Sequence, residues 1–208
     1  MRPARRLQLW RNIATDRIRR LPVVTLMTHS RCNCRCVMCD IWKNNNNPSE
    51  ISIDAAREWV PALRELRVEN LVFSGGEALM HSDLWGLNDV LREAGAQHTL
   101  LTTGLLLEKY AEPVAREFND VIVSLDGSEQ VHNEIRNLPR AWAKLASGVA
   151  ALQAQPGAPT ISARCVLQRG NIGDFLQTIA AARQLGLASI SFLPADLSSD
   201  AFSHDNEW

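Results

Sequence analysis

The stretch from residue 21 to residue 39, LPVVTLMTHSRCNCRCVMC, decides the fold and the kind of site that the chain carries. Val23 to Thr28 is apolar and rich in β-branched residues, which predicts a β-strand. Cys32, Cys36 and Cys39 follow directly, with three and then two intervening residues. Three thiols in one short loop can hold three corners of a cubane iron–sulfur cluster. The sequence therefore predicts a cysteine-ligated centre directly after the first strand.

Similar strand signals recur five times further along the chain. Longer stretches with helical periodicity separate them, joined by connections that contain Gly, Asn, Asp or Pro. Parallel neighbours need long crossovers, which helices supply, so the alternation predicts an α/β fold. Six units are fewer than the eight of a closed barrel, which leaves an open partial (β/α)6 barrel or a flat doubly wound sheet. The expected strands are 23–28, 70–73, 98–101, 121–125, 160–167 and 189–193.

Helix boundaries are also visible in the sequence. Polar N-caps open one helix at Ser52 and another at Ser82 or Asp83, and the second helix ends before Gly95. Apolar residues at three-four spacing predict a buried helical face in 142–152 and in 175–185. A proline lies inside two further helical patterns, where it predicts a kink or a boundary: Pro61 and Pro113.

Composition points to one soluble domain that is 208 residues long, with 46% apolar and 22% charged residues. The net charge of −1 gives no polyelectrolyte character, so nucleic acid is not expected as a partner. Arginines crowd residues 1–20, which we interpret as a basic, solvated N-terminal arm preceding a core domain at 21–208. No apolar run approaches the roughly 20 residues of a membrane span, and no secretory signal opens the chain, so we expect a cytoplasmic protein without a membrane partner.

The cysteines favour a reactive cluster over a structural metal. Four of the five lie between residues 32 and 39, whereas a disulfide framework would spread an even number along the chain. A structural zinc site would need a second Cys or His pair, and a cluster with three thiolates keeps one iron open. Cys34 either ligates in a shifted register or, as we expect, packs as a compact apolar residue against the strand.

The C-x3-C-x2-C loop after the first strand resembles the radical S-adenosylmethionine (SAM) superfamily, and the resemblance covers residues 21–193. It implies a partial (β/α)6 barrel in which Cys32, Cys36 and Cys39 are the catalytic ligands of a 4Fe-4S cluster. SAM would chelate the open iron, and one electron would cleave it to methionine and a 5′-deoxyadenosyl radical that abstracts hydrogen from an unknown substrate. An electron donor such as flavodoxin or ferredoxin is implied as a partner. Met38 stands where relatives often have an aromatic residue, which weakens the expected adenine contact.

Further matches follow later strands. Gly75, Gly76 and Glu77 look like the family's GGE motif: the glycines would let the backbone approach the cofactor, and Glu77 would accept hydrogen bonds from the SAM amino group. Thr103 stands where relatives often have asparagine and is a weaker candidate for a cofactor contact.

The sequence SLDG at 124–127 is similar to the branch that contains molybdenum-cofactor and peptide-modifying members. The resemblance makes Ser124 and Asp126 cofactor contacts, and Arg136 a partner of the methionyl carboxylate. His132, four residues before that arginine, is expected to be an ordinary exposed or capping histidine. Relatives in this branch often carry a cysteine-rich C-terminal extension, which this chain lacks.

All of these positions fall at the carboxyl ends of predicted parallel strands, which meet on one face of an α/β fold. We therefore expect them to converge in space. By alternation along the fifth strand, Arg164 and Gln168 should face the barrel interior. The polar segment 194–208 covers no strand, so the chain is expected to be truncated at its C-terminus. Two alternatives stay open: a non-enzymatic zinc or labile Fe–S redox-sensing module, and an inactive fragment of a longer enzyme.

Overall fold

The computed structural model describes Trp10 and residues 13–196, which build one sheet of six parallel strands. The expected strands are all present, and their bounds agree with the prediction to within two residues. Most of the basic arm (residues 1–9, 11 and 12) and the end of the polar tail (197–208) lie outside the described residues. The strands are β1 (Val23–His29), β2 (Asn70–Gly75), β3 (Gln97–Thr102), β4 (Asp120–Ser124), β5 (Thr160–Leu167) and β6 (Ile190–Pro194).

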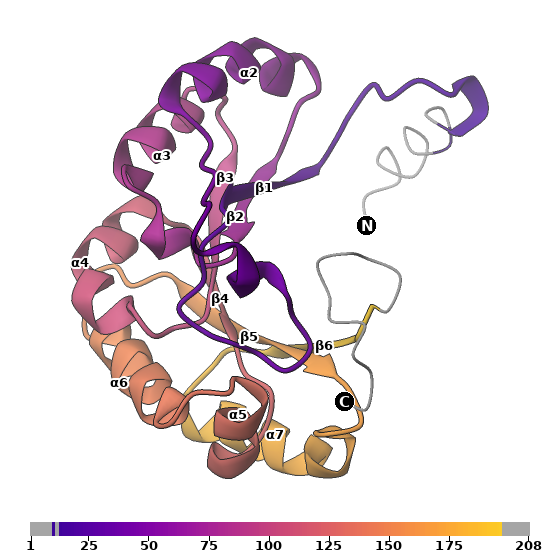
Figure 1. Ribbon diagram of the computed structural model, residues 1–208. Helices are drawn as coiled ribbons and strands as arrows, with labels where there is room; N and C mark the ends of the chain where they lie inside the picture. The colour runs from indigo at the N-terminus through magenta and orange to yellow at the C-terminus, as the bar shows by residue number, and fades with distance from the viewer. Residues whose placement is uncertain (1–9, 11–12, 197–208) are drawn as a thin grey trace.

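The strand order decides between the two architectures that the sequence left open. Neighbours in the sheet run β1-β2-β3-β4-β5-β6, so each strand pairs with the next one along the chain. A doubly wound sheet reverses direction at a switch point, and this sheet never does. Figure 1 shows the strands curving inside an arc of helices. The expected open partial barrel is therefore confirmed.

Six α-helices connect the strands and cover the outer, convex side of the sheet (Figure 1). Two of the expected N-caps are formed: Ser52 Oγ accepts from Ala55 N at 3.2 Å, and Asp83 Oδ1 accepts from Gly86 N at 3.0 Å. In the described part of the chain, no helix combines the length and apolarity that crossing a bilayer requires. The helices are α2 (Ile53–Glu65), α3 (Leu84–Arg92), α4 (Leu107–Glu117), α5 (Glu129–Ile135), α6 (Ala141–Gln153) and α7 (Phe175–Gln184).

The two helix prolines differ in their effect. In α4 the backbone leaves helical geometry at Tyr110, three residues before Pro113, which is the kink that the sequence predicts. In α2 the helix continues through Pro61 to Glu65. The prediction at Pro61 was therefore wrong about a boundary.

The core divides into a large cluster between sheet and helices and a small one beneath the cysteine loop, which we define as residues 30–39. The large cluster includes Leu71, Phe73 and Leu100, which are fully buried. In the small cluster Cys34, Cys36 and Met38 pack on Ile135 at the end of α5. Helix α5 thus supports the loop from below, although no helix is expected at 129–135 from the sequence.

Candidate active site

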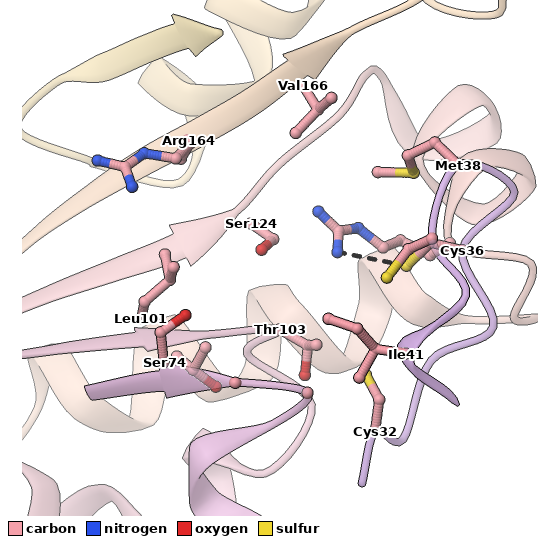
Figure 2. A pocket seen from close by; sticks show the side chains of 15 residues that line it. Cys32, Cys36, Met38, Ile41, Ser74, Leu101, Thr103, Ser124, Arg164 and Val166 are labelled. Atoms are coloured by element: carbon pink, nitrogen blue, oxygen red, sulfur yellow. Dashed lines mark hydrogen bonds between the residues drawn. The ribbon is translucent and has the colours of Figure 1, made fainter. Parts of the chain in front are cut away.

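The carboxyl ends of the strands surround one cavity of about 190 Å³ (Figure 2). The cysteine loop forms one wall, and the ends of β2 to β5 form the others. Most of the residues that the sequence singled out meet here, which parallel strand ends explain. The lining residues are Cys32, Cys36, Met38, Cys39, Ile41, Ser74, Gly75, Gly76, Leu101, Thr102, Thr103, Ser124, Arg136, Arg164 and Val166.

Three thiols stand in the wall of this cavity. Cys36 is buried, and Cys32 and Cys39 are half-buried. Within the described residues, no three His, Cys, Asp or Glu side chains already meet at metal-binding distance. The donor set nevertheless fits an iron–sulfur cluster with an open iron, because the wall supplies three cysteines and no histidine.

Cys34 lies under this wall. Its side chain is 1% exposed, and its main-chain N–H donates to Cys32 Sγ at 3.5 Å. It packs with Ile135 of α5, so the expected packing against the strand is corrected to packing against a helix. The Cys34 thiol also donates to its neighbours, which lowers the pKa of Cys32 and raises that of Cys34 itself.

Arg136 brings positive charge to the thiols. Its Nη1 donates to Cys36 Sγ at 3.5 Å, and only 7% of the residue is exposed. Hydrogen bonding from the Cys34 thiol, followed by the Arg136 charge, lowers the pKa of Cys36 to about 6 against the opposing effect of burial. Burial dominates at Cys39 and raises its pKa to about 11. Cys36 is thus the thiol best prepared to ligate as a thiolate.

Asp126 is turned away from the cavity. Its Oδ2 pairs with Arg136 Nη2 at 2.5 Å, and its Oδ1 accepts from Val166 N at 3.0 Å. The residue is fully buried and does not line the wall. The expected direct cofactor contact stays a prediction, and in this structure Asp126 holds the guanidinium that reaches Cys36. His132, expected to be exposed or capping, is 1% exposed, and burial lowers its pKa to about 3.

The Glu77 carboxylate is engaged by the protein. Oε1 accepts from Leu79 N (3.1 Å) and Thr102 Oγ1 (2.8 Å), and Oε2 from Thr103 N (2.7 Å) and Thr103 Oγ1 (2.5 Å). Four donors occupy the roughly four lone-pair sites of a carboxylate. The side chain is fully buried and outside the cavity wall, so the expected contact with an amino group stays a prediction. In this structure Glu77 joins the ends of β2 and β3.

The structure explains why the two residues before Glu77 are glycines, which the sequence alone did not reveal. A Cβ on Gly75 would lie 2.3 Å from His29 O, and one on Gly76 would lie 2.1 Å from Arg31 O. The expected close approach is thus to the backbone that leads into the cysteine loop. Gly76 N donates to His29 O and Glu77 N to Arg31 O, both at 2.7 Å. The Gly-Gly-Glu segment therefore anchors the start of the loop, while Gly75 and Gly76 also line the cavity.

The remaining predicted residues lie around the wall. Thr103 Oγ1 bridges Glu77 and Asn33 Oδ1, the latter at 3.0 Å. Figure 2 shows Ser124 between the cysteine loop and Arg164 on β5. Arg164 Nε is buried without a hydrogen-bond partner among the described residues, which leaves a cation available to the cavity. Gln168, also expected inside, is buried but does not line the cavity.

Sequence reasoning missed the contacts that hold the cysteine loop from its other sides. Val37 N donates to Ile135 O at 3.0 Å, and Arg35 N donates to Arg136 O at 3.4 Å. Asn45, which belongs to a run interpreted as a flexible loop, bonds to both main-chain groups of Cys32. Neither Asn45 nor Ile135 belongs to a recognisable sequence motif, so these contacts become visible only in the folded structure.

Comparison with known proteins agrees with this site. A model of the Radical SAM superfamily matches residues 26–195. The chain is 26% identical over 159 residues to an AdoMet-dependent heme synthase of Methanosarcina barkeri, covering 74% of this chain and 45% of the relative. It is 40% identical over 98 residues to a probable GTP 3′,8-cyclase of Archaeoglobus fulgidus, covering 46% and 32% respectively. The chain thus spans less than half the length of these relatives.

A solved structure shares the fold. SuiB of Streptococcus suis, bound to S-adenosylmethionine, superposes with a TM-score of 0.68 at 15% identity, covering 94% of this chain and 46% of that one. At such low identity the likeness concerns the fold. The resemblance first seen in the cysteine spacing is thereby confirmed by a family match over most of the chain.

Proposed function

The chain belongs to the radical SAM superfamily, and from this premise we propose that it generates a 5′-deoxyadenosyl radical and abstracts hydrogen from a substrate. Members of this family use a 4Fe-4S cluster and SAM. The observation that carries the proposal is that Cys32, Cys36 and Cys39 line one cavity to which the described residues contribute no fourth cysteine and no histidine. An iron without a protein ligand is then open to the cofactor.

In this proposal Cys32, Cys36 and Cys39 hold the cluster. When bound, the cluster supplies the electron that breaks the sulfonium C5′–S bond of SAM, leaving methionine and the 5′-deoxyadenosyl radical. The Arg136 charge favours the Cys36 thiolate, and Asp126 acts as a positioning residue because it orients Arg136. The walls of the cavity would shield the reacting atoms from water.

The polar part of SAM would bind across the strand ends. Main-chain groups at Gly75 and Gly76 are the nearest counterparts for an amino group, while Glu77 fixes their position from behind. Ser124 and Arg164 would bind the carboxylate, because Arg164 is a cation in the wall whose buried Nε has no hydrogen-bond partner among the described residues. Thr103 would contribute its hydroxyl group at the edge of the same surface.

The apolar part of the wall would keep water from the reacting atoms. Met38, Leu101 and Val166 line the cavity together with Ile41. A radical that is shielded by such side chains reacts with the positioned substrate rather than with solvent. The relatives named above act on different molecules, so the substrate stays outside this proposal.

The electron donor is proposed to be an acidic flavodoxin or ferredoxin. Arg31 and Arg35 are exposed on the cysteine loop, adjacent in sequence to Cys32 and to Cys34 and Cys36. Complementary charge would steer an acidic carrier to this loop. We expect Arg35→Glu to slow reduction by flavodoxin and leave reduction by dithionite unchanged, whereas equal rates with flavodoxin would contradict this docking site.

A zinc-binding or labile redox-sensing module is the second candidate, because Cys34 offers a fourth sulfur next to Cys32. Metal analysis after anaerobic purification and reconstitution separates the two. We expect about four irons and four acid-labile sulfides per chain, retained in Cys34→Ala and lost in Cys36→Ala. One zinc without labile sulfide, lost equally in both variants, would support the module and contradict the enzyme.

A further inference from the structure

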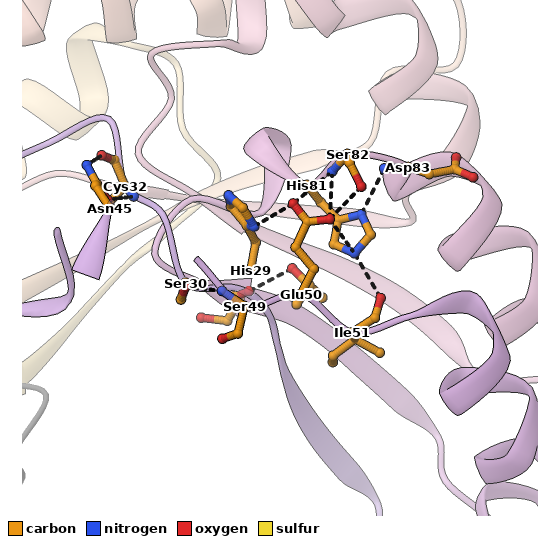
Figure 3. Close-up of polar contacts among 12 residues, drawn as sticks. His29, Ser30, Cys32, Asn45, Ser49, Glu50, Ile51, His81, Ser82 and Asp83 are labelled. Atoms are coloured by element: carbon orange, nitrogen blue, oxygen red, sulfur yellow. Dashed lines mark hydrogen bonds and ion pairs between the residues drawn. The ribbon is translucent and has the colours of Figure 1, made fainter. Parts of the chain in front are cut away.

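In the asparagine run at residues 44–47, the side chain of Asn45 forms hydrogen bonds with the cysteine loop. Asn45 Oδ1 accepts from Cys32 N at 3.0 Å, and Asn45 Nδ2 donates to Cys32 O at 3.0 Å (Figure 3). One amide thus binds both main-chain groups of a single residue. Because these groups lie on either side of the Cys32 Cα atom, the pair restricts rotation of both adjoining peptide planes and so the direction of the Cα–Cβ bond that carries Sγ.

The segment that carries Asn45 is itself fixed at its base. Residues 40–51, which we call the return segment, run back beside β1, where Glu50 forms an antiparallel bridge with His29. Ser30 N donates to Ser49 O at 3.0 Å, and Ile51 N donates to Thr28 O at 3.1 Å.

Side chains reinforce this base, as Figure 3 shows. Glu50 Oε1 lies 2.9 Å from His29 Nδ1, and its Oε2 accepts from Ser82 Oγ at 2.5 Å. Asn45 therefore contacts Cys32 from a segment that is anchored to β1 and to the start of α3. Because the return segment is anchored, the hydrogen bonds from Asn45 can restrain Cys32.

Each of the three cluster cysteines is held by contacts of its own: Cys32 Sγ accepts from Cys34 N within the loop, and its main-chain groups bond to Asn45. Cys36 receives a hydrogen bond from Arg136, and Val37 N beside it is bound to the end of α5. Cys39 N donates to Cys36 O at 3.2 Å, which ties it to the same part of the loop. Asn45 supplies the corresponding restraint for Cys32 from outside the loop.

We propose that Asn45 is a positioning residue that holds Cys32 in the direction required to ligate the cluster. The proposal rests on the function proposed above, and it concerns Asn45 alone within the asparagine run. Asn46 provides a matched control, because it lies next in the chain, has an exposed side chain, and makes no side-chain hydrogen bond among those found in the described residues.

The test begins with the metal-free protein, in which no cluster can mask the effect. Reduced wild type, Asn45→Ala, Asn45→Asp and Asn46→Ala are treated with iodoacetamide, and alkylation of each cysteine is followed by peptide mass spectrometry. We expect Cys32 to react about tenfold faster in Asn45→Ala, which corresponds to about 1.4 kcal/mol and matches the loss of two ordinary hydrogen bonds. Asn45→Asp keeps the acceptor, so Cys32 in this variant should react at a rate between those of wild type and Asn45→Ala. Cys39 should react at the wild-type rate in every variant.

The second measurement uses the reconstituted protein. Asn45→Ala should lose labile sulfide to EDTA about tenfold faster than wild type, and its reduced cluster should give an altered electron paramagnetic resonance spectrum. The unfolding temperature of metal-free Asn45→Ala should fall by only about 2–5 °C, so an unchanged alkylation rate at Cys39 separates positioning of Cys32 from general destabilisation.

The outcomes distinguish the two proposals. If Asn45→Ala matched wild type in Cys32 alkylation and in loss of labile sulfide, the role of Asn45 would be overturned. The same would follow if Asn46→Ala accelerated both rates as much as Asn45→Ala does. Either result would leave the proposed function intact. A wild-type protein that binds no iron–sulfur cluster would overturn the proposed function, and with it any role of Asn45 in ligation, even if Cys32 were alkylated faster in Asn45→Ala.

Discussion

Arg136 donates to Cys36 Sγ at 3.5 Å with one guanidinium nitrogen, while the other pairs with the Asp126 carboxylate at 2.5 Å. One side chain thereby connects a thiol of the cysteine loop to the end of β4. The ion pair is buried, with Arg136 7% exposed and Asp126 fully enclosed. Charge at the thiol and integrity of the fold are therefore coupled through Arg136.

The first prediction concerns the acidity of Cys36 in the metal-free protein. Its pKa of about 6 depends first on the Cys34 thiol and then on Arg136. Cys34→Ala removes the larger of these contributions, so we expect the pKa of Cys36 to rise toward the ordinary thiol value of about 8.5. The pH dependence of iodoacetamide labelling, resolved by peptide, measures it. An unchanged Cys36 profile in Cys34→Ala would contradict the prediction.

The second prediction concerns the buried ion pair. Arg136→Met leaves the Asp126 carboxylate enclosed without its cation, which should lower the free energy of unfolding by about 3–5 kcal/mol. Urea titration of the metal-free protein followed by circular dichroism measures the change. Arg57→Met breaks an exposed pair with Asp54 and should have little effect. Equal, small effects of both substitutions would show that Asp126 does not depend on Arg136.

The third prediction separates two roles of Glu77. Because its carboxylate accepts four protein hydrogen bonds, Glu77→Gln places an amide NH₂ against buried donors. We expect the free energy of unfolding of the metal-free protein to fall by about 1–3 kcal/mol. Thr103→Val removes one of those donors and should lower the free energy of unfolding by a smaller amount. A Glu77→Gln protein with wild-type stability and weakened SAM binding would restore the direct contact that the sequence suggested.

The fold could be predicted because its signals are local and repeated. Six apolar strand segments, separated by helical periodicity, determine a parallel α/β sheet, and the cysteine spacing identifies the site. Convergence of the site residues followed from a rule about strand ends rather than from any single motif. Where the sequence left two architectures open, the strand order decided, because topology is not encoded in periodicity.

The side-chain contacts could not be predicted, because they depend on long-range geometry. Asp126 and Glu77 look like ligand contacts in the sequence, yet each one is turned into the protein by a partner on another element. Gly75 is required by the approach of β1, which no local pattern announces. Asn45 is indistinguishable from its neighbours in the run until the return segment is folded against Cys32. Polar residues near a site are thus found from sequence more easily than their roles are.

Reductive cleavage of SAM tests the central claim most directly. The wild-type protein, reconstituted anaerobically with iron and sulfide, is mixed with dithionite and SAM, and 5′-deoxyadenosine and methionine are measured by liquid chromatography. We predict that wild type and Cys34→Ala release both products and that Cys36→Ala releases neither. A folded wild-type protein with full iron and sulfide content that released no 5′-deoxyadenosine would contradict the account.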